Sequence, residues 1–179
     1  ILNKISKHAD ILELGLPHNT PIADGGQIQG SSHRALKNGI KLKDVFQIVR
    51  KFKKNNPNKP VILMGYFNLI YQNGENNFLE SCKSSGVDGL IIVDLPYPEN
   101  KNFSYKCKKQ NPNKPLILMG YFNLIYQNGE NNFLKNCKAS GVDGLIIVDL
   151  PYPENKIFAN KCKMKSINFV QLLSPTTSK

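Results

Sequence analysis

The chain has 179 residues and a formal net charge of +11, with 40% hydrophobic and 21% charged residues. This composition excludes an intrinsically disordered chain. It also excludes a membrane helix, because the longest apolar runs, such as Leu90–Val93, are far shorter than the roughly 20 residues needed to span a bilayer. The length suits one domain with a buried core, or part of a larger domain. Since the first residue is Ile1 and not Met, we interpret it as a cut end.

The positive charge comes almost entirely from lysine, since Arg34 and Arg50 are the only arginines. Nucleic-acid sites favour Arg, whose planar guanidinium makes two hydrogen bonds to a base or phosphate. The lysines are scattered, with clusters at 51–54 and 106–109, where helices are expected to end and cations are favoured by the helix dipole. We therefore expect most lysines to lie on solvated faces, with a polyanion site as the alternative.

Apolar runs and helical patterns alternate along the chain. The first run, 10–15, predicts a short strand, and a loop rich in Pro and Gly follows it. A helical stretch then covers about 32–54 and is expected to break near Gly39. Further strands are predicted at 61–66, 90–93 and 168–173, and helices at 78–85, ending at Gly86, and at 103–109. Continuous apolar strands that alternate with helices predict an α/β fold with a parallel sheet.

A long segment of the chain occurs twice. Residues 56–108 recur as 111–163 at an offset of about 55 residues, with about seven differences such as Glu80/Lys135. Two nearly identical copies indicate a recent duplication or an error in assembling the source sequence, because the repeats of solenoid proteins diverge further. Each copy contains two β-α units, so one β-α-β-α unit is predicted to be present twice.

The four cysteines follow this repeat, at Cys82, Cys107, Cys137 and Cys162. None forms a CxxC pair, and no His stands at metal-ligand spacing from them, so we predict no metal site. We expect reduced thiols on helices, as in a cytoplasmic protein.

Carboxylates stand near the carboxyl ends of the predicted strands, where α/β folds place their active sites. Glu13 is surrounded in sequence by Ile11, Leu12 and Leu14, and desolvation there would raise its pKa toward a useful acid-base range. Asp24 lies in the following loop, and two carboxylates in different environments can divide acid and base roles. The structural alternative is that the Glu caps a neighbouring helix and the Asp forms an Asx turn.

Other polar residues give weaker signals. Asp94 and Asp149 also end strands, but their Asp-Leu-Pro context suits a turn equally well. His8, His18 and His33 have no nucleophile beside them in an elbow motif, so we expect them to be solvent or loop residues.

Five motifs occur in a fixed order: Leu12-Glu13-Leu14-Gly15, Pro21-Ile22-Ala23-Asp24-Gly25, Met64-Gly65-Tyr66-Phe67-Asn68, Val93-Asp94-Leu95-Pro96 and Ser174-Pro175-Thr176-Thr177. In this order they resemble the tryptophan synthase alpha subunit family, over almost the whole chain once one copy of the repeat is set aside. The resemblance implies a (β/α)8 TIM barrel, here a single partial-barrel domain over 1–179. It also implies a lyase that cleaves indole-3-glycerol phosphate to indole and glyceraldehyde 3-phosphate in tryptophan biosynthesis.

The same resemblance assigns roles to individual residues. Glu13 and Asp24 match the two catalytic acids, the first acting at indole C3 and the side-chain hydroxyl, the second binding the indole N–H. The implied substrate-binding residues are Met64, Tyr66, Ile91 and Asp94. The family implies no metal and no cofactor for the alpha reaction, since pyridoxal phosphate belongs to the beta subunit. The implied partner is that beta subunit, in a cytoplasmic α2β2 complex.

The chain also departs from the family's pattern. It has Asn19-Thr20-Pro21 where the family has Ser-Asp-Pro, and Asp24-Gly25-Gly26 where the family has Asp-Gly-Pro. A complete barrel takes roughly 250 residues, whereas about 124 remain here once one copy is removed. The first strand, the last three strands and the glycine-rich phosphate loops have no counterpart, so we expect poor phosphate binding and low activity.

Two further expectations follow for the assembly and the function. We expect an open parallel sheet whose exposed apolar edges promote self-association, with both copies of the repeat able to pair with the first predicted strand. The alternative functions are a non-catalytic partner that binds a beta subunit and another phosphate-binding TIM-barrel enzyme.

Overall fold

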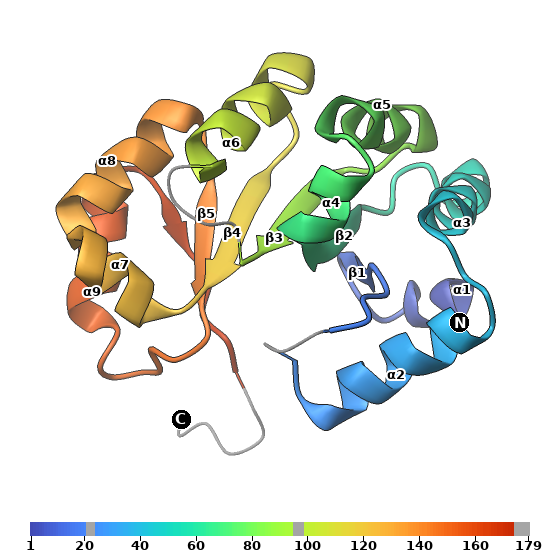
Figure 1. Cartoon of the computed structure of the whole chain (residues 1–179), viewed down its shortest axis with the longest axis horizontal. Coiled ribbons are helices and arrows are strands. Elements are labelled where there is room, and N and C mark those ends of the chain that lie inside the picture. The colour runs from blue at the N-terminus through green and yellow to red at the C-terminus, as the bar shows by residue number, and fades with distance from the viewer. Residues whose placement is uncertain (21–23, 95–98, 174–179) are drawn as a thin grey trace. The chain divides into compact units, whose positions relative to one another are not determined.

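Helices and strands alternate in the computed structural model, which describes residues 1–20, 24–94 and 99–173 (Figure 1). The chain divides into two compact units, Ile1–Ile92 and Val93–Lys179. Strand β1 pairs with β2 in the first unit, and β4 pairs with β5 and β5 with β6 in the second, all in parallel. The predicted α/β class with a parallel sheet is therefore confirmed. The prediction of a single domain over 1–179 stays a prediction.

The first unit builds its strands from apolar runs. Its elements are α1 (Leu2–Ile5), β1 (Leu12–Gly15), α2 (Gly26–Lys37), α3 (Leu42–Asn55), β2 (Val61–Tyr66), α4 (Phe67–Gln72), α5 (Glu75–Ser85) and β3 (Gly89–Val93), whose last residue begins the second unit. Of the two copies that could pair with the first strand, the first copy does so, with Leu12 opposite Val61 and Gly15 opposite Met64.

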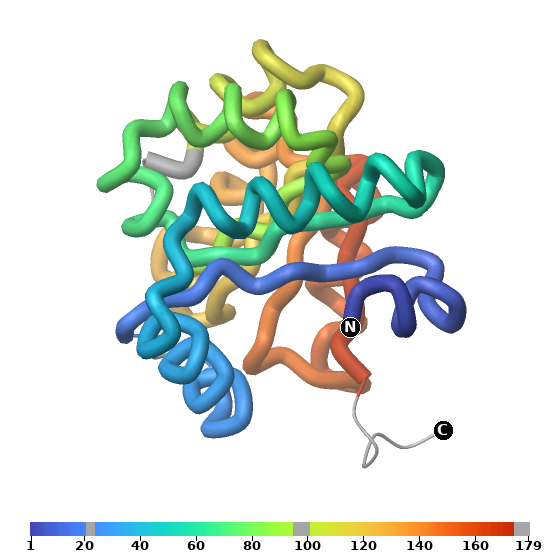
Figure 2. The backbone as a smooth tube through the Cα atoms, turned by 90° about the vertical axis from the view of Figure 1, so that its right-hand side faces the viewer, coloured from blue at the N-terminus to red at the C-terminus, as the bar shows by residue number. Residues whose placement is uncertain are grey.

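One face of α3 and alternate residues of β2 form the core of this unit. The buried side chains of α3 are Val45, Phe46, Val49 and Phe52, spaced as one face of a helix requires. In β2, the buried Val61 and Leu63 alternate with the partly exposed Ile62 and Met64, the period of two that a strand imposes. Figure 2 shows α3 running alongside β2, as a helical crossover between parallel strands does.

Helix α5 ends at Gly86, as predicted. Gly86 has φ +81°, the left-handed conformation that glycine adopts without strain. The Gly86 N–H donates to the Lys83 carbonyl and the Val87 N–H to the Cys82 carbonyl, the paired bonds of a Schellman cap. Gly141 ends the corresponding helix of the second copy with the same pair of bonds.

The second unit repeats most of this pattern. Its elements are α6 (Glu99–Gln110), β4 (Leu116–Gly120), α7 (Phe122–Asn128), α8 (Glu130–Ser140), β5 (Gly144–Ile147), α9 (Lys156–Met164) and β6 (Asn168–Phe169). Because the two copies of the repeat are nearly identical, β4-α7-α8-β5 follows the order of β2-α4-α5-β3.

Two lysines have a structural role that differs from the solvated role we predicted. The Lys53 Nζ lies 2.8 Å from Asp88 Oδ2, and the same oxygen accepts a hydrogen bond from the Val61 N–H at 2.9 Å. In the second unit the Lys108 Nζ lies 2.6 Å from Asp143 Oδ2, which accepts the Leu116 N–H at 2.8 Å. Each Asp side chain therefore links the end of a helix to the start of the strand that follows that helix.

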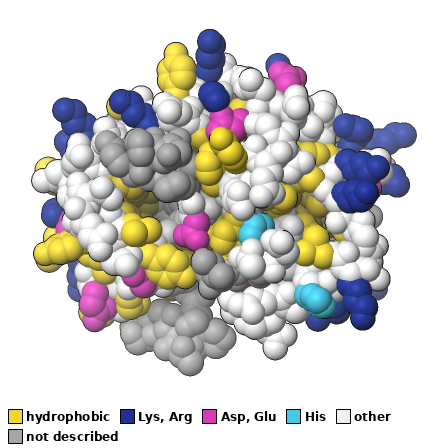
Figure 3. All heavy atoms as spheres, viewed as in Figure 1, with side chains coloured by type: hydrophobic (Ala, Val, Ile, Leu, Met, Phe, Trp, Pro, Cys, Tyr) yellow, Lys and Arg dark blue, Asp and Glu magenta, His cyan; other side chains and the backbone are white. Residues whose placement is uncertain are grey.

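The two predicted lysine clusters do reach helix ends, as expected. Lys53 and Lys54 lie in the last turn of α3, and Lys108 and Lys109 in the last turn of α6, where the helix dipole favours cations. On the face that Figure 3 shows, the Lys and Arg side chains of the described residues lie in several separate groups.

Several predicted boundaries were wrong. The break near Gly39 is confirmed, with φ +76° there, but the helix before it begins at Gly26 and not near Ser32. Helices α4 and α7 were not predicted, because each is short and follows a strand with no turn residue between them. The last strand is Asn168–Phe169 only, not 168–173. The predicted motifs at 21–23, 95–98 and 174–177 lie outside the described residues.

Helix α6 presents a more polar face than α3. The matching Lys–Asp pairs align Lys53 with Lys108, so Val49 of α3 corresponds to Ser104 of α6. Both side chains are fully buried, and the Ser104 Oγ has no hydrogen-bond partner among the described residues. A buried hydroxyl without a partner costs free energy of folding. A serine in place of a valine also removes part of the apolar packing that the first unit has at this position.

Candidate active site

The predicted catalytic Glu13 lies on one face of the β1–β2 pair. In the parallel register Glu13 lies opposite Ile62, and Gly15 opposite Met64. Because side chains alternate along a strand, Glu13 shares its face with Ile62, Met64 and Tyr66, while Leu12 and Leu63 belong to the other face. Three of the predicted site residues thus stand on a single face of two adjacent strands, although only Tyr66 ends its strand.

Asp24 reaches the same region from the loop that follows β1. The Tyr66 hydroxyl donates a hydrogen bond to Asp24 Oδ2 at 3.2 Å. Tyr66 is buried, with 8% of its surface exposed, so its hydroxyl is held in place by the fold. This bond joins a predicted catalytic residue to a predicted substrate-binding residue.

His18 is a residue of this region that sequence analysis missed. Its ring stacks on the Tyr66 ring with centroids 4.8 Å apart and an angle of 24° between the planes. Its Nδ1 accepts a hydrogen bond from the Thr20 N–H at 3.1 Å, which fixes the orientation of the ring. His18 lies in the loop after β1, as predicted, but no motif in the sequence pairs it with an aromatic ring 48 positions away.

Glu13 has the electrostatics of an acid-base group. Its side chain is exposed, yet nearby protein atoms remove enough water to raise its pKa above the ordinary 4.5. The direction agrees with the expectation drawn from the apolar residues that flank it. A raised pKa moves a carboxyl group toward the range in which it can both give and take a proton near neutral pH.

Ile91 lies on β3, and its position relative to β2 can be inferred from the second copy of the repeat. There Met119 and Ile146, the counterparts of Met64 and Ile91, are register partners of β4 and β5. The bond that sets this register, from the Asp143 N–H to the Leu116 carbonyl, has its equivalent in the bond from the Asp88 N–H to the Val61 carbonyl. The same register therefore places Ile91 beside Met64.

Asp94 belongs to the second unit, unlike the other predicted site residues. It has φ +52°, and its backbone N–H donates to the Met119 carbonyl at 3.2 Å. Partial burial raises the pKa of its carboxyl above the ordinary 3.8. Asp149, its counterpart in the second copy, accepts the Phe122 N–H at 2.7 Å and so caps the start of α7, a structural role.

The described residues contain no cluster of three or more His, Cys, Asp or Glu side chains that could hold a metal ion. The cysteines lie on helices α5, α6, α8 and α9, as the sequence predicted, and their side chains are buried. Within the same described ranges, no helix is long and apolar enough to cross a membrane.

The family model described as tryptophan synthase alpha chain matches residues 1–112 and again residues 105–179. The chain belongs to this family. The resemblance drawn from the motifs is thereby confirmed. The two matched segments overlap at 105–112 and between them include both copies of the repeat.

Relatives in the tryptophan synthase alpha chain family share much of the sequence. The chain is 71% identical over 110 residues to the tryptophan synthase alpha chain of Pelagibacter ubique, a match that covers 62% of this chain and 42% of that protein. It is 48% identical over 106 residues to the Pyrococcus furiosus protein, with 59% of this chain and 42% of that protein covered. The chain thus spans less than half the length of the curated relatives that it matches.

Solved structures of the family share the fold. A structure of the tryptophan synthase a2b2 complex from Pyrococcus furiosus matches with a TM-score of 0.76 and 31% identity, covering 97% of this chain and 71% of that one. A mutant tryptophan synthase alpha-subunit from the same organism matches with a TM-score of 0.75 and 31% identity, over the same shares of the two chains. The predicted partial barrel of the TIM-barrel type is confirmed by these matches.

Proposed function

We propose that this chain contributes the active-site half of a tryptophan synthase alpha chain, a lyase that cleaves indole-3-glycerol phosphate to indole and glyceraldehyde 3-phosphate. The observation that carries the proposal is the hydrogen bond between Tyr66 and Asp24, 3.2 Å long. It holds a carboxylate near the strand face that bears Glu13, in a chain whose family is tryptophan synthase alpha chain.

The reaction needs an acid, a base and a group that receives a developing positive charge. Indole is a poor carbanion leaving group, so C3 must take a proton before the bond from C3 to the glycerol chain breaks. Glu13 supplies that proton to C3 and accepts the proton of the side-chain hydroxyl, whose oxygen becomes the aldehyde oxygen. Its raised pKa supports both steps, because the protonated and ionised forms are then both accessible.

Asp24 acts at the other end of the indole ring. Protonation at C3 leaves a positive charge that spreads to the ring N–H, and a carboxylate that accepts that N–H stabilises the charge. Tyr66 orients Asp24 through its hydroxyl, and His18 packs on the Tyr66 ring. Met64 and Ile91 offer apolar contacts for the ring.

We propose the remaining properties from the family. The partner is a tryptophan synthase beta subunit in an α2β2 complex, the assembly that the Pyrococcus furiosus protein forms. The alpha reaction needs no cofactor, since its proton transfers use carboxylates alone. The location is the cytoplasm, where tryptophan is made.

The experiment is an indole-release assay on indole-3-glycerol phosphate, with and without an added tryptophan synthase beta subunit. We expect Glu13→Gln to lower the rate by about 10²–10⁴-fold, the usual contribution of a general acid-base residue. Glu80→Gln, on the surface of α5, is the matched control and should leave the rate unchanged. Equal indole release by the unaltered chain and by Glu13→Gln would show that the catalytic assignment is wrong.

The alternative that the chain is a non-catalytic partner makes a different prediction in the same assay. The altered Asn19-Thr20 segment favours it, because the family has an Asp there. In that case neither the chain nor its variants release indole, while the added beta subunit changes its own rate in the presence of the chain.

A further inference from the structure

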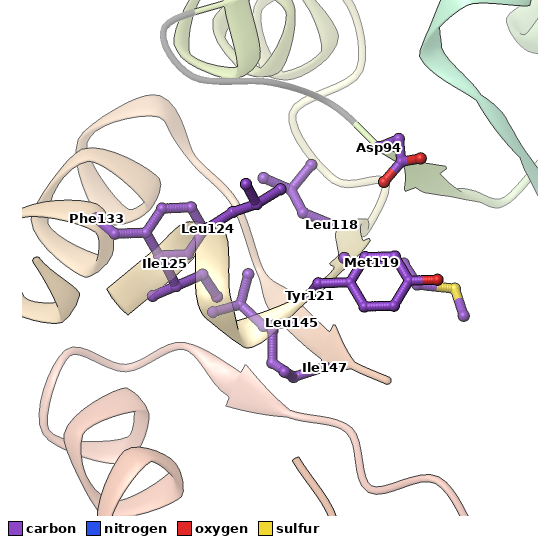
Figure 4. Close-up of a pocket in the computed structure, with 10 residues that line it drawn as sticks. Asp94, Leu118, Met119, Tyr121, Leu124, Ile125, Phe133, Leu145 and Ile147 are labelled. Atoms are coloured by element: carbon purple, nitrogen blue, oxygen red, sulfur yellow. The ribbon is translucent and has the colours of Figure 1, made fainter. Parts of the chain in front are cut away.

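The second unit contains a cavity of about 340 Å³ between its strands and its helices. Leu118 of β4 and Leu145 of β5 form its floor, and Leu124, Ile125 and Phe133 of α7 and α8 form its walls. Figure 4 shows these side chains around a common space, with Asp94 at one edge on the side of Met119 and Tyr121. Almost all of the lining is apolar.

The cavity exists because nearly identical strands have different neighbours in the two units. In the first unit a methyl group added at Gly65 would lie 2.6 Å from Leu16 Cδ1, so the Leu16 side chain covers this glycine. In the second unit the counterpart is Gly120, which lines the cavity, and a methyl group there would meet no atom of the described residues within 4 Å. The cavity thus continues over Gly120, where the first unit has a leucine.

The helices around the cavity are also packed less tightly than their counterparts. Phe78 of α5 is 2% exposed and meets Phe46 of α3 edge to face, with centroids 5.7 Å apart. Its counterpart Phe133 is partly exposed, and the position on α6 that corresponds to Phe46 is Lys101. Leu124, on α7, is 51% exposed. The apolar surface around the cavity therefore lacks, within the described part of the chain, the partners that cover the same side chains in the first unit.

The size and chemistry of the cavity indicate its ligand. Ligand pockets of about 300–1,000 Å³ are mostly apolar with a few polar groups that fix orientation. Apolar cavities of about 150 Å³ stay free of water and bind benzene, so this one has room for a one- or two-ring aromatic molecule. The Asp94 carboxylate offers hydrogen-bond acceptors at the edge, and an ionised carboxylate binds an N–H or O–H donor strongly.

We propose that this cavity binds a small aromatic molecule carrying one N–H or O–H group, with its ring between α7, α8 and the β4–β5 strands and its polar hydrogen on Asp94. The site does not depend on the proposed function, because every lining residue named here belongs to the second unit. Glu13 and Asp24 of the candidate active site belong to the first.

The first experiment measures binding of phenol and of toluene to the intact 179-residue chain by calorimetry, and maps it by amide chemical shifts in ¹⁵N-labelled protein. We expect saturable phenol binding, shift changes centred on Leu124 and Phe133, and about tenfold weaker binding of toluene, which lacks the donor. Failure of phenol to bind, or shift changes confined to the first unit, would overturn the proposal.

Variants then test which residues form the site. Gly120→Leu fills the space over the glycine and should weaken phenol binding by at least about tenfold without loss of secondary structure. Leu124→Ala removes a wall and should weaken it as well, whereas Leu69→Ala at the repeat counterpart should not. Asp94→Asn should remove most of the preference for phenol over toluene. Unchanged phenol affinity in both Gly120→Leu and Leu124→Ala would overturn the site.

Discussion

The glycines at the ends of β2 and β4 allow the same substitution to be compared in the same local sequence. Gly65→Ala and Gly120→Ala each add one methyl group within an identical Met-Gly-Tyr segment. At Gly65 the new carbon would lie 2.6 Å from Leu16 Cδ1 and 3.0 Å from Leu16 Cβ and Cγ. At Gly120 it would meet no heavy atom of the described residues within 4 Å.

The magnitudes follow from these distances. Carbon atoms attract best at about 3.5–4.0 Å, so Leu16, which is only 5% exposed, would have to move within a packed core. Overpacking of this kind costs about 1–3 kcal/mol. In open space, Gly→Ala stabilises by about 0.4–1 kcal/mol, because Ala restricts the unfolded chain. Because the effect on the unfolded chain is the same for both variants, they should differ by the overpacking cost alone, about 2 kcal/mol in the free energy of unfolding, or roughly 6 °C in Tm.

Thermal unfolding followed by far-ultraviolet circular dichroism measures this difference. We expect Gly65→Ala to unfold at a lower temperature than the unaltered chain and Gly120→Ala at the same or a higher one. In a Leu16→Ala background the cost of Gly65→Ala should largely vanish, which identifies Leu16 as the clashing partner. Equal shifts in Tm for the two substitutions would refute the claim that the two copies are packed differently.

Three further predictions concern other buried or desolvated groups. Ser104→Ala introduces the residue that the second copy has at this position, Ala159. Because it removes a buried hydroxyl without a partner among the described residues, a gain of about 1 kcal/mol, it should raise the Tm by about 2–4 °C. A lower Tm would mean that the hydroxyl is bonded. The pKa of Glu13 is raised in the folded chain, so the stability it contributes is complete below pH 4.5 and is lost as the pH rises through the raised value. Urea unfolding should therefore show Glu13→Gln gaining stability relative to the unaltered chain as the pH increases above 4.5, and a difference independent of pH would contradict this. Burial raises the pKa of Cys137 to about 12 and that of Cys162 to about 11, so iodoacetamide at mildly alkaline pH should modify them only after unfolding in guanidinium, as peptide mass spectrometry can show. Rapid labelling of either thiol in the folded chain would contradict its burial.

The sequence predicted those residues of the candidate site that stand on the apolar strands. Glu13 stands within the first apolar run and Tyr66 ends the second, and the parallel register of the two strands brings both to one face. The bond from Tyr66 to Asp24 joins residues 42 positions apart, and the sequence predicted only that both belong near the site. The ring of His18 on Tyr66 was not predicted, because a stacked pair distant in sequence leaves no periodic pattern.

The sequence by itself determined the α/β class, the helix cap at Gly86, the family and the existence of two nearly identical copies. These depend on local patterns and on motif order, which do not require knowledge of neighbours in space. Only the tertiary structure decided that the first copy pairs with β1, that Lys53 and Lys108 bind Asp88 and Asp143, and that the second copy has a cavity. The physical reason is that packing depends on what each segment meets, so Gly65 lies under Leu16 while the identical Gly120 lines the cavity.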